Sequence, residues 1–117
     1  MGEPLEMLRA AGDFDALQAA NRSRAHPLLV IRWRRNDIGR TRFGLSTGRR
    51  LGGAVVRNRV RRRLREALRA SDHRPNGGWD ILIVCRPQSA TAGYTELRAA
   101  LDKLLQRMDR DEGSEAQ

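Results

Sequence analysis

The sequence has 117 residues and a formal net charge of +9, which limits it to one domain with a modest core and favours an anionic partner. Every basic residue except Lys103 is an arginine, and because a guanidinium forks onto phosphate and stacks on bases, nucleic acid fits better than a membrane surface. No apolar run reaches the roughly 20 residues of a membrane span, and the single cysteine, Cys85, excludes an internal disulfide framework.

The sequence also indicates the cellular compartment of the protein. Cys85 lies in an apolar run, so we expect a buried, reduced thiol. The start of the chain, MGEPLEML, carries Glu3 and Glu6 and no basic residue, which is not typical of a signal peptide. The sequence therefore predicts a cytoplasmic protein with no membrane association.

The first half of the chain predicts a short helix and two strands. Asp13 is the expected N-cap of a helix over residues 14–20. Residues 28–34 and 40–47 alternate between apolar and polar side chains, with a turn at 35–39, and predict an antiparallel hairpin. One face of this hairpin is apolar and the other is rich in arginine. The arginine face carries Arg32, Arg34, Arg40 and Arg42.

The second half predicts a helix, a buried strand and a second helix. The segment VVRNRVRRRLREALR, residues 55–69, has helical periodicity. Residues 79–86 are apolar on both faces, as in a central strand, and residues 93–108 form an amphipathic helix. We expect residues 1–108 to form a single α+β domain, a two-layer sandwich, and the acidic residues 109–117 to be a disordered tail.

The arginine-rich helix needs an explanation, because like charges four residues apart each cost a helix roughly 0.2–0.5 kcal/mol. At 100° per residue, one arc is apolar and can face a sheet. The opposite arc carries Asn58, Arg61, Arg62, Arg65 and Arg69, with Arg57, Arg59 and Arg63 at its flanks. An ordinary charged helix also presents a solvated face, but acidic residues are nearly absent from this one. Arg49 and Arg50, in the glycine-rich connection before the helix, are also well placed for phosphate.

This basic surface suits RNA better than sequence-specific DNA binding, since no second short helix precedes the arginine helix at helix-turn-helix spacing. Catalytic candidates in the chain are poor. The carboxylates are scattered rather than clustered as a two-metal nuclease requires, and His26 and His73 are isolated. The sequence therefore predicts no catalytic residue and no metal site in the protein.

Residues 42–69, RFGLSTGRRLGGAVVRNRVRRRLREALR, resemble the signature of the bacterial ribonuclease P protein subunit. The shared features are Gly44-Leu45-Ser46, the pair Arg49-Arg50, Gly53-Ala54-Val55, Arg57-Asn58-Arg59 and Arg65-Glu66. The segments 12–17 and 79–87 also resemble the first helix and the last strand of that family, so the resemblance extends over about residues 5–108.

The resemblance implies a fold, a function and a set of contacts. The fold is α-β-β-β-α-β-α with a mixed four-stranded sheet, a short extra strand near residues 22–25 and a left-handed βαβ crossover. The protein would be a subunit of the holoenzyme that cuts the 5′ leader from precursor tRNA, with catalysis and Mg²⁺ belonging to the RNA subunit. No cofactor is expected on the protein alone, and no protein partner.

The resemblance also implies two binding surfaces. The RNA subunit would be bound by Arg49, Arg50, Arg57, Asn58, Arg59, Arg61, Arg62, Arg65 and Arg69. The leader would lie in a cleft lined by Phe14, Leu28, Val30, Arg32 and Arg42. Gln18 stands one turn after Phe14, where members of the family often have a second aromatic residue.

Two other functions compete with this one. The chain could belong to another ribonucleoprotein, such as the ribosome, as a non-catalytic RNA-binding protein, although the Arg-Asn-Arg signature argues against that. It could also be a self-sufficient nuclease, although it lacks the carboxylate cluster that such an enzyme needs.

Overall fold

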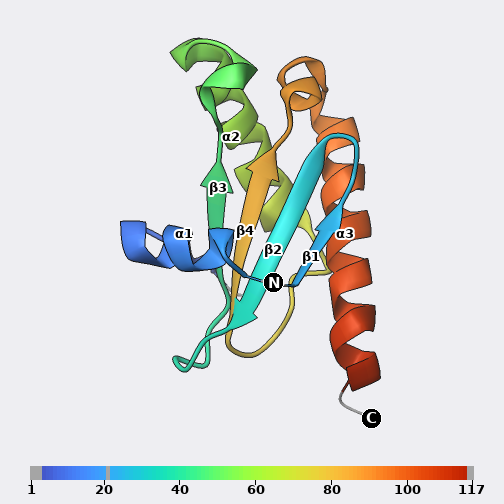
Figure 1. Cartoon of the computed structure of the whole chain (residues 1–117). Coiled ribbons are helices and arrows are strands. Elements are labelled where there is room, and N and C mark those ends of the chain that lie inside the picture. Colours follow the sequence, from blue (N-terminus) through green and yellow to red (C-terminus); the bar gives the residue numbers. More distant parts are fainter. Residues whose placement is uncertain (1–3, 21, 116–117) are drawn as a thin grey trace.

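The computed structural model describes residues 4–20 and 22–115 (Figure 1). In chain order its elements are α1 (Ala11–Gln18), β1 (Arg22–Ala25), β2 (Leu29–Arg35), β3 (Arg42–Ser46), the 3-10 turn η1 (Arg49–Leu51), α2 (Ala54–Ala70), β4 (Trp79–Cys85), the 3-10 turn η2 (Pro87–Thr91) and α3 (Tyr94–Glu115). This is the α-β-β-β-α-β-α order that the resemblance implies, including the short strand β1. None of the helices in these residues is long and apolar enough to cross a membrane.

The sheet is mixed and has the strand order β1-β2-β4-β3. The predicted hairpin is wrong, because β4 lies between β2 and β3, antiparallel to the first and parallel to the second. The composition of β4 explains this position. All but one of its residues are buried, and a strand that is apolar on both faces is most stable between two neighbours.

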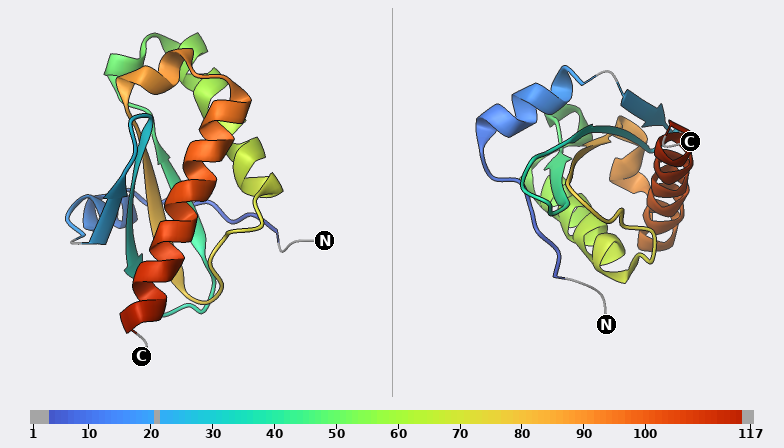
Figure 2. Two further views of the ribbon diagram at one scale, coloured as in Figure 1. Left: turned by 90° about the vertical axis from the view of Figure 1, so that its right-hand side faces the viewer. Right: turned by 90° about the horizontal axis from the view of Figure 1, so that it is seen from below.

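The crossover from β3 through α2 to β4 is left-handed, as the resemblance implies and against the general rule for parallel strands. In Figure 1 both strands point upward, β4 lies to the right of β3, and α2 runs behind the sheet. Figure 2 shows α1 on one side of the sheet and α2 on the other. We call these two sides of the sheet the α1 face and the α2 face.

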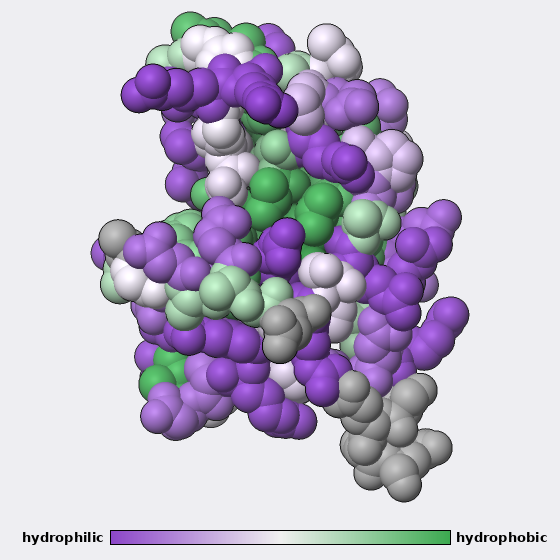
Figure 3. Space-filling view, viewed as in Figure 1, coloured by the Kyte–Doolittle hydropathy of each residue, from purple (hydrophilic) through white to green (hydrophobic). Residues whose placement is uncertain are grey.

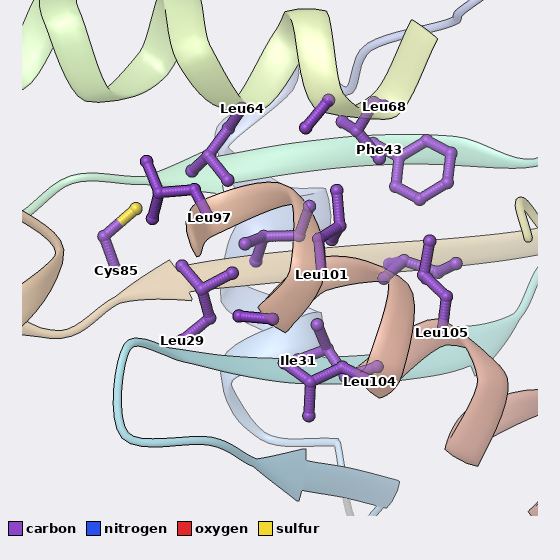
Figure 4. Close-up of a cluster of buried hydrophobic side chains, with 14 of the residues drawn as sticks. Leu29, Ile31, Phe43, Leu64, Leu68, Cys85, Leu97, Leu101, Leu104 and Leu105 are labelled. Atoms are coloured by element: carbon purple, nitrogen blue, oxygen red, sulfur yellow. The ribbon is translucent and has the colours of Figure 1, made fainter. Parts of the chain in front are cut away.

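The main core lies between the α2 face and the two long helices. Leu29, Ile31 and Trp33 of β2 point into it, as the alternation of the strand predicts. They meet one apolar stripe from α2 and another from α3, so that strands and helices share a single cluster (Figure 4). A smaller cluster on the α1 face joins Leu17 of α1 to Leu82 of β4 and Leu8.

Helix α1 begins at Ala11, three residues before its predicted start. Asp13 is not the N-cap but lies in the first turn of the helix, and Ala10 occupies the cap position without a side-chain hydrogen bond. The Asp13 carboxylate instead contacts Arg34 and Arg42 on the sheet. These long-range ion pairs explain why the local capping prediction was wrong.

Helix α3 continues to Glu115, so the prediction of a disordered tail from residue 109 is also wrong. Asp111 and Glu112 lie against the sheet edge and accept hydrogen bonds from Arg24 and Trp33. The acidic composition suggested disorder, but partners far away in the sequence order this segment. The last two residues of the predicted tail, 116–117, lie outside the described residues.

Candidate nucleic-acid interface

The basic side of α2 faces away from the core along the whole helix. Val60, Leu64, Ala67 and Leu68 are buried, which turns the opposite side outward. The residues predicted to bind the RNA subunit form what we call the α2 surface. Its exposed members are Arg49, Arg50, Asn58, Arg62, Arg65 and Arg69, and its half-buried members are Arg57, Arg59 and Arg61. The structure thus brings these residues together along one helix and the turn before it.

Little negative charge compensates the α2 surface. Glu66 is the only acidic residue of the helix, and it accepts a hydrogen bond from Arg69 over 2.8 Å. Arg61 donates to the neutral side chain of Asn58 over 3.3 Å. Because like charges at helical spacing repel one another, the surface has a strong electrostatic preference for an anion.

Two arginines at the flank of α2 also have a structural role. Arg59 donates to the carbonyl of Ala90 over 3.3 Å, and Arg63 donates to the carbonyl of Ala92 over 2.8 Å. These bonds attach α2 to the η2 turn and to Ala92, the residue that follows it. Among the described residues, the Nε atoms of Arg57 and Arg59 are buried without a hydrogen-bond partner. Buried donors without a partner are uncommon in folded proteins.

The start of α2 adds a favourable backbone field. Gly53 is the N-cap and supplies no side-chain hydrogen bond, so the first N–H groups of the helix are not capped by a side chain. The helix dipole favours an anion at this end, and the exposed Arg49 and Arg50 of η1 lie just before it in the chain. Val55, in the first turn of α2, is 78% exposed, so the described residues leave this side chain open to solvent.

A second surface lies on the α1 face. Helix α1 covers only part of that face, and Figure 3 shows a hollow above it with an apolar floor and a hydrophilic rim. Val30 and Val84 are cross-strand partners on this face, and both are half-buried. Arg32 is next on the same face of β2 and makes no ion pair or hydrogen bond among the described residues. We call this region the α1 hollow.

Phe14 forms the α1 side of the hollow, where it packs against the sheet at Gly44. A Cβ atom added to Gly44 would lie 2.8 Å from Cε1 of the Phe14 ring, well inside contact distance. The glycine in the middle of β3 therefore exists where an aromatic ring approaches the backbone. This contact leaves Phe14 half-buried, with part of the ring open to the solvent.

Two of the five residues predicted for the leader cleft have other contacts in the structure. Leu28 precedes β2 and packs against the main core rather than against the cluster of Phe14. Arg42 does lie on the α1 face, but its guanidinium is already bound. It donates from Nε and from Nη2 to the two carboxylate oxygens of Asp80, both over 2.9 Å.

Asp80 is the centre of a polar network beneath α1. Its side chain is fully buried, and it also accepts hydrogen bonds from Arg34 over 3.3 Å and from Asn36 over 2.9 Å. Burial alone would raise the pKa of Asp80, but the hydrogen bonds from Arg42 and Asn36 outweigh it and hold the pKa below its ordinary value. Through Asp13, which contacts both arginines, the network fixes α1 on the sheet.

A cavity of about 820 Å³ lies elsewhere, between the N-terminal segment, the β2–β3 turn and the loop after α2. Arg40 and Arg74 line it together with Glu6 and Asp72. None of the α2-surface residues and none of the α1-hollow residues lines this cavity, so its volume does not mark the basic site. In the described part of the chain, no group of three or more His, Cys, Asp or Glu side chains is arranged to hold a metal ion.

Reasoning from sequence missed Asp80 and the role of Gly44. Asp80 interrupts an otherwise apolar strand, and a buried charge needs partners, so its position was a signal for a paired arginine. Gly44 interrupts a strand in the same way, and this pattern indicates a close approach by another group. Neither signal identifies the partner, which comes from a distant part of the chain.

Comparisons with known proteins agree on one family. The family model described as Ribonuclease P matches residues 3–109. The ribonuclease P protein component of Herpetosiphon aurantiacus is 35% identical over 101 residues, which are 86% of this chain and 82% of that protein. That of Symbiobacterium thermophilum is 38% identical over 95 residues, which are 80% of this chain and 83% of that protein.

Solved structures show the same fold. The RNase P protein from Thermotoga maritima superposes with a TM-score of 0.77 at 28% identity, covering 87% of this chain and 96% of that one. The RNase P protein from Staphylococcus aureus superposes with a TM-score of 0.78 at 23% identity, covering 90% and 96%.

Proposed function

The chain belongs to the ribonuclease P protein family, and from this premise we propose that its α2 surface grips the RNA subunit while its α1 hollow binds the 5′ leader of precursor tRNA. As a member of the family it is a subunit of ribonuclease P, with the RNA subunit and precursor tRNA as its partners. The observation that carries the assignment of surfaces is the largely uncompensated row of exposed arginines on α2.

On the α2 surface, phosphate recognition would use side chains and backbone together. Arg62, Arg65 and Arg69 are exposed on one side of the helix, where guanidiniums can fork onto phosphate oxygens. The half-buried Arg57 and Arg59 lie at the flank of this row. An RNA phosphate at the start of α2 would add the favourable interaction with the helix dipole.

In the α1 hollow, the chemistry suits a single strand. The half-buried Val30 and Val84 offer apolar contact to bases and sugars, and the half-buried Phe14 offers a stacking surface. Arg32 supplies a cation that no carboxylate in the described residues occupies. Leu28 and Arg42 leave the set of leader contacts, and Arg42 becomes a residue that positions α1 through Asp80 and Asp13.

Catalysis would reside in the RNA subunit, with Mg²⁺ held by RNA. Cys85 is not a candidate nucleophile, because burial raises the pKa of its thiol to about 12. A buried free thiol and an RNA partner also support a cytoplasmic location, and the protein would act there as a single RNA-binding domain with no protein partner.

Reconstitution tests this function. The purified protein is added to a bacterial ribonuclease P RNA at low Mg²⁺, and leader release from precursor tRNA is followed. We expect cleavage that needs the RNA and is stimulated by the protein, and none with the protein alone. Cleavage by the protein alone would assign it as a nuclease. Capture of ribosomal RNA without ribonuclease P RNA from a cell lysate would instead assign it to another ribonucleoprotein.

A further inference from the structure

The last turns of α3 cover the outer edge of the sheet with two carboxylates. Arg24 of β1 donates to both oxygens of Asp111, over 2.7 and 2.6 Å. Arg22 donates to Glu112 over 3.1 Å, and the same Glu112 oxygen accepts from Nε1 of Trp33 over 2.7 Å. Asp111 and Glu112 lie beyond residue 109, where the match to the family model ends.

Without these carboxylates, the edge would be strongly basic. β1 is the edge strand of the sheet and all four of its residues are exposed. Across from it, Lys103 and Arg107 of α3 lie close enough to His26 to lower its pKa, although its burial is the larger cause. Arg110 lies close to Asp111. The β1–α3 edge is the name we use for Arg22, Arg24, Lys103, Arg107 and Arg110.

This edge continues the α1 hollow. Ser23 pairs with Arg32, and Ala25 pairs with Val30, so β1 is the next strand beyond the floor of the hollow. Neighbouring strands are only about 4.8 Å apart. Ser23 and Ala25 share the face of the hollow, whereas Arg22 and Arg24 alternate to the opposite face, toward α3. An RNA strand that leaves the hollow across β2 would therefore reach these two arginines where it rounds the exposed edge of the sheet.

The two carboxylates differ in how firmly they are held. Glu112 satisfies the indole N–H of the buried Trp33, so its removal would disturb the fold. Among the described residues, Asp111 bonds to Arg24 alone, and the pair is open to solvent, with Arg24 46% and Asp111 28% exposed. A phosphate presents the same two-oxygen geometry to a guanidinium as this carboxylate does. RNA can thus replace Asp111 on Arg24 while Glu112 keeps the helix docked.

We propose that the β1–α3 edge is a second RNA-backbone site, which takes the upstream part of a long 5′ leader and which Asp111 occupies when that RNA is absent. The proposal rests on the proposed function of the α1 hollow. Its consequence is that the acidic end of α3 lowers the affinity for long leaders and leaves short leaders unaffected.

The test uses the reconstituted holoenzyme with precursor tRNAs carrying leaders of about 4 and about 16 nucleotides, which span the usual range of single-strand sites. Asp111→Asn removes the competing charge, and Asp109→Asn is the matched control. Asp109 carries the same charge on an exposed part of the same helix and has no ion pair among the described residues. The affinity of the holoenzyme for each precursor tRNA is measured at several salt concentrations.

We expect Asp111→Asn to raise affinity for the long leader about two- to fivefold, as the loss of one exposed competing pair allows. Each additional bond to a phosphate should steepen the slope of log K against log[salt] by about 0.7. The short leader and Asp109→Asn should show no such increase. Arg24→Gln breaks the same ion pair from the other side, so it has the same effect on folding, yet it should lower the affinity for the long leader.

Equal increases for Asp111→Asn and Asp109→Asn, or equal increases for both leaders, would overturn the proposal, since the effect would then be net charge alone. A higher affinity with Arg24→Gln would also overturn it. Failure of the proposed function looks different. In that case the wild-type holoenzyme would bind precursor and mature tRNA equally, whatever the leader length.

Discussion

Asp80 shows how a single buried charge positions a binding element. It lies on the α1 face of the central strand and gathers Arg34, Arg42 and Asn36 around one carboxylate. Asp13 adds α1 to the same network. One residue near the start of β4 thus fixes the helix that carries Phe14, the aromatic wall of the α1 hollow.

Replacing Asp80 by Asn should lower the free energy of unfolding by about 2 kcal/mol at neutral pH, because two guanidiniums lose their shared anion. Since the folded-state pKa of Asp80 is depressed below its ordinary value of 3.8, its contribution is present above that pH and is lost as the pH falls further. The difference between wild type and variant should therefore shrink in acid. Urea titrations at pH 7 and pH 3 measure the difference in unfolding free energy between the wild type and the Asp80→Asn variant. Asp37→Asn, at an exposed position, is the control. A difference that does not depend on pH would contradict the role of the Asp80 carboxylate.

Gly44→Ala should weaken leader binding without weakening RNA-subunit binding. The added methyl group would lie 2.8 Å from the Phe14 ring, so the ring must move away from β3. Because Phe14 is half-exposed it can move, and the cost to stability should stay near 1 kcal/mol, the low end for overpacking. Gly48→Ala is the control, since nothing lies within 4 Å of its added Cβ. Equal binding of precursor tRNA by both variants would remove Phe14 from the hollow.

At the scale of elements, α2 combines a packing face with a proposed binding face. Changing Arg61 and Arg65 together to Gln removes like-charge pairs with Arg57 and Arg69 and keeps helix propensity. The free protein should be equally stable or slightly more stable. Binding to the RNA subunit should weaken. The slope of log K against log[salt] should flatten by roughly 0.7–0.9 for each phosphate that is no longer bound.

The control for that variant is Arg35→Gln with Arg98→Gln, which removes the same charge outside the α2 surface. Arg35 stacks on Trp79 and Arg98 belongs to α3, so both lie on other elements. If both double variants flatten the salt dependence equally, net charge explains the binding and the α2 surface has no special role. If the Arg61/Arg65 variant unfolds and its salt dependence is unchanged, those arginines stabilise the fold instead.

The end of α3 is the element whose role changed most between sequence and structure. Deleting residues 111–117 should lower the melting temperature by several degrees, because Trp33 loses the acceptor for its indole N–H, a loss of about 1 kcal/mol. Deleting only residues 114–117 keeps Asp111 and Glu112 and should have little effect. Thermal melts of the two truncated proteins measure this. Equal melting temperatures for the longer deletion and the full chain would show that α3 does not depend on its acidic end.

The elements themselves were largely predictable, and their neighbours were not. Alternation identified β2, β3 and their faces, and the continuous apolar run identified β4 as a central strand. Periodicity cannot tell which strands pair, so the insertion of β4 between β2 and β3 was missed. The end of α3 was missed for the same reason, since its partners Arg24 and Trp33 are far away in sequence.

At the scale of the whole molecule, the two proposed RNA-binding surfaces lie on opposite sides of one sheet. Helix α1 and its hollow are on one face, and α2 is packed on the other (Figure 2). The left-handed crossover places α2 there directly after β3. Since the two surfaces share no side chain, the protein can hold the RNA subunit with one and the leader with the other at the same time.

The most direct test of this division compares two variants in one assay. The variants are Arg61→Gln/Arg65→Gln on the α2 surface and Phe14→Ala/Arg32→Gln in the α1 hollow. Two quantities are measured for each: the Kd of the protein for ribonuclease P RNA, and the ratio of the Kd values of the protein-saturated holoenzyme for mature and precursor tRNA. We predict that the first variant raises only the Kd for the RNA and the second lowers only the ratio; variants that change both quantities together would contradict two separate surfaces.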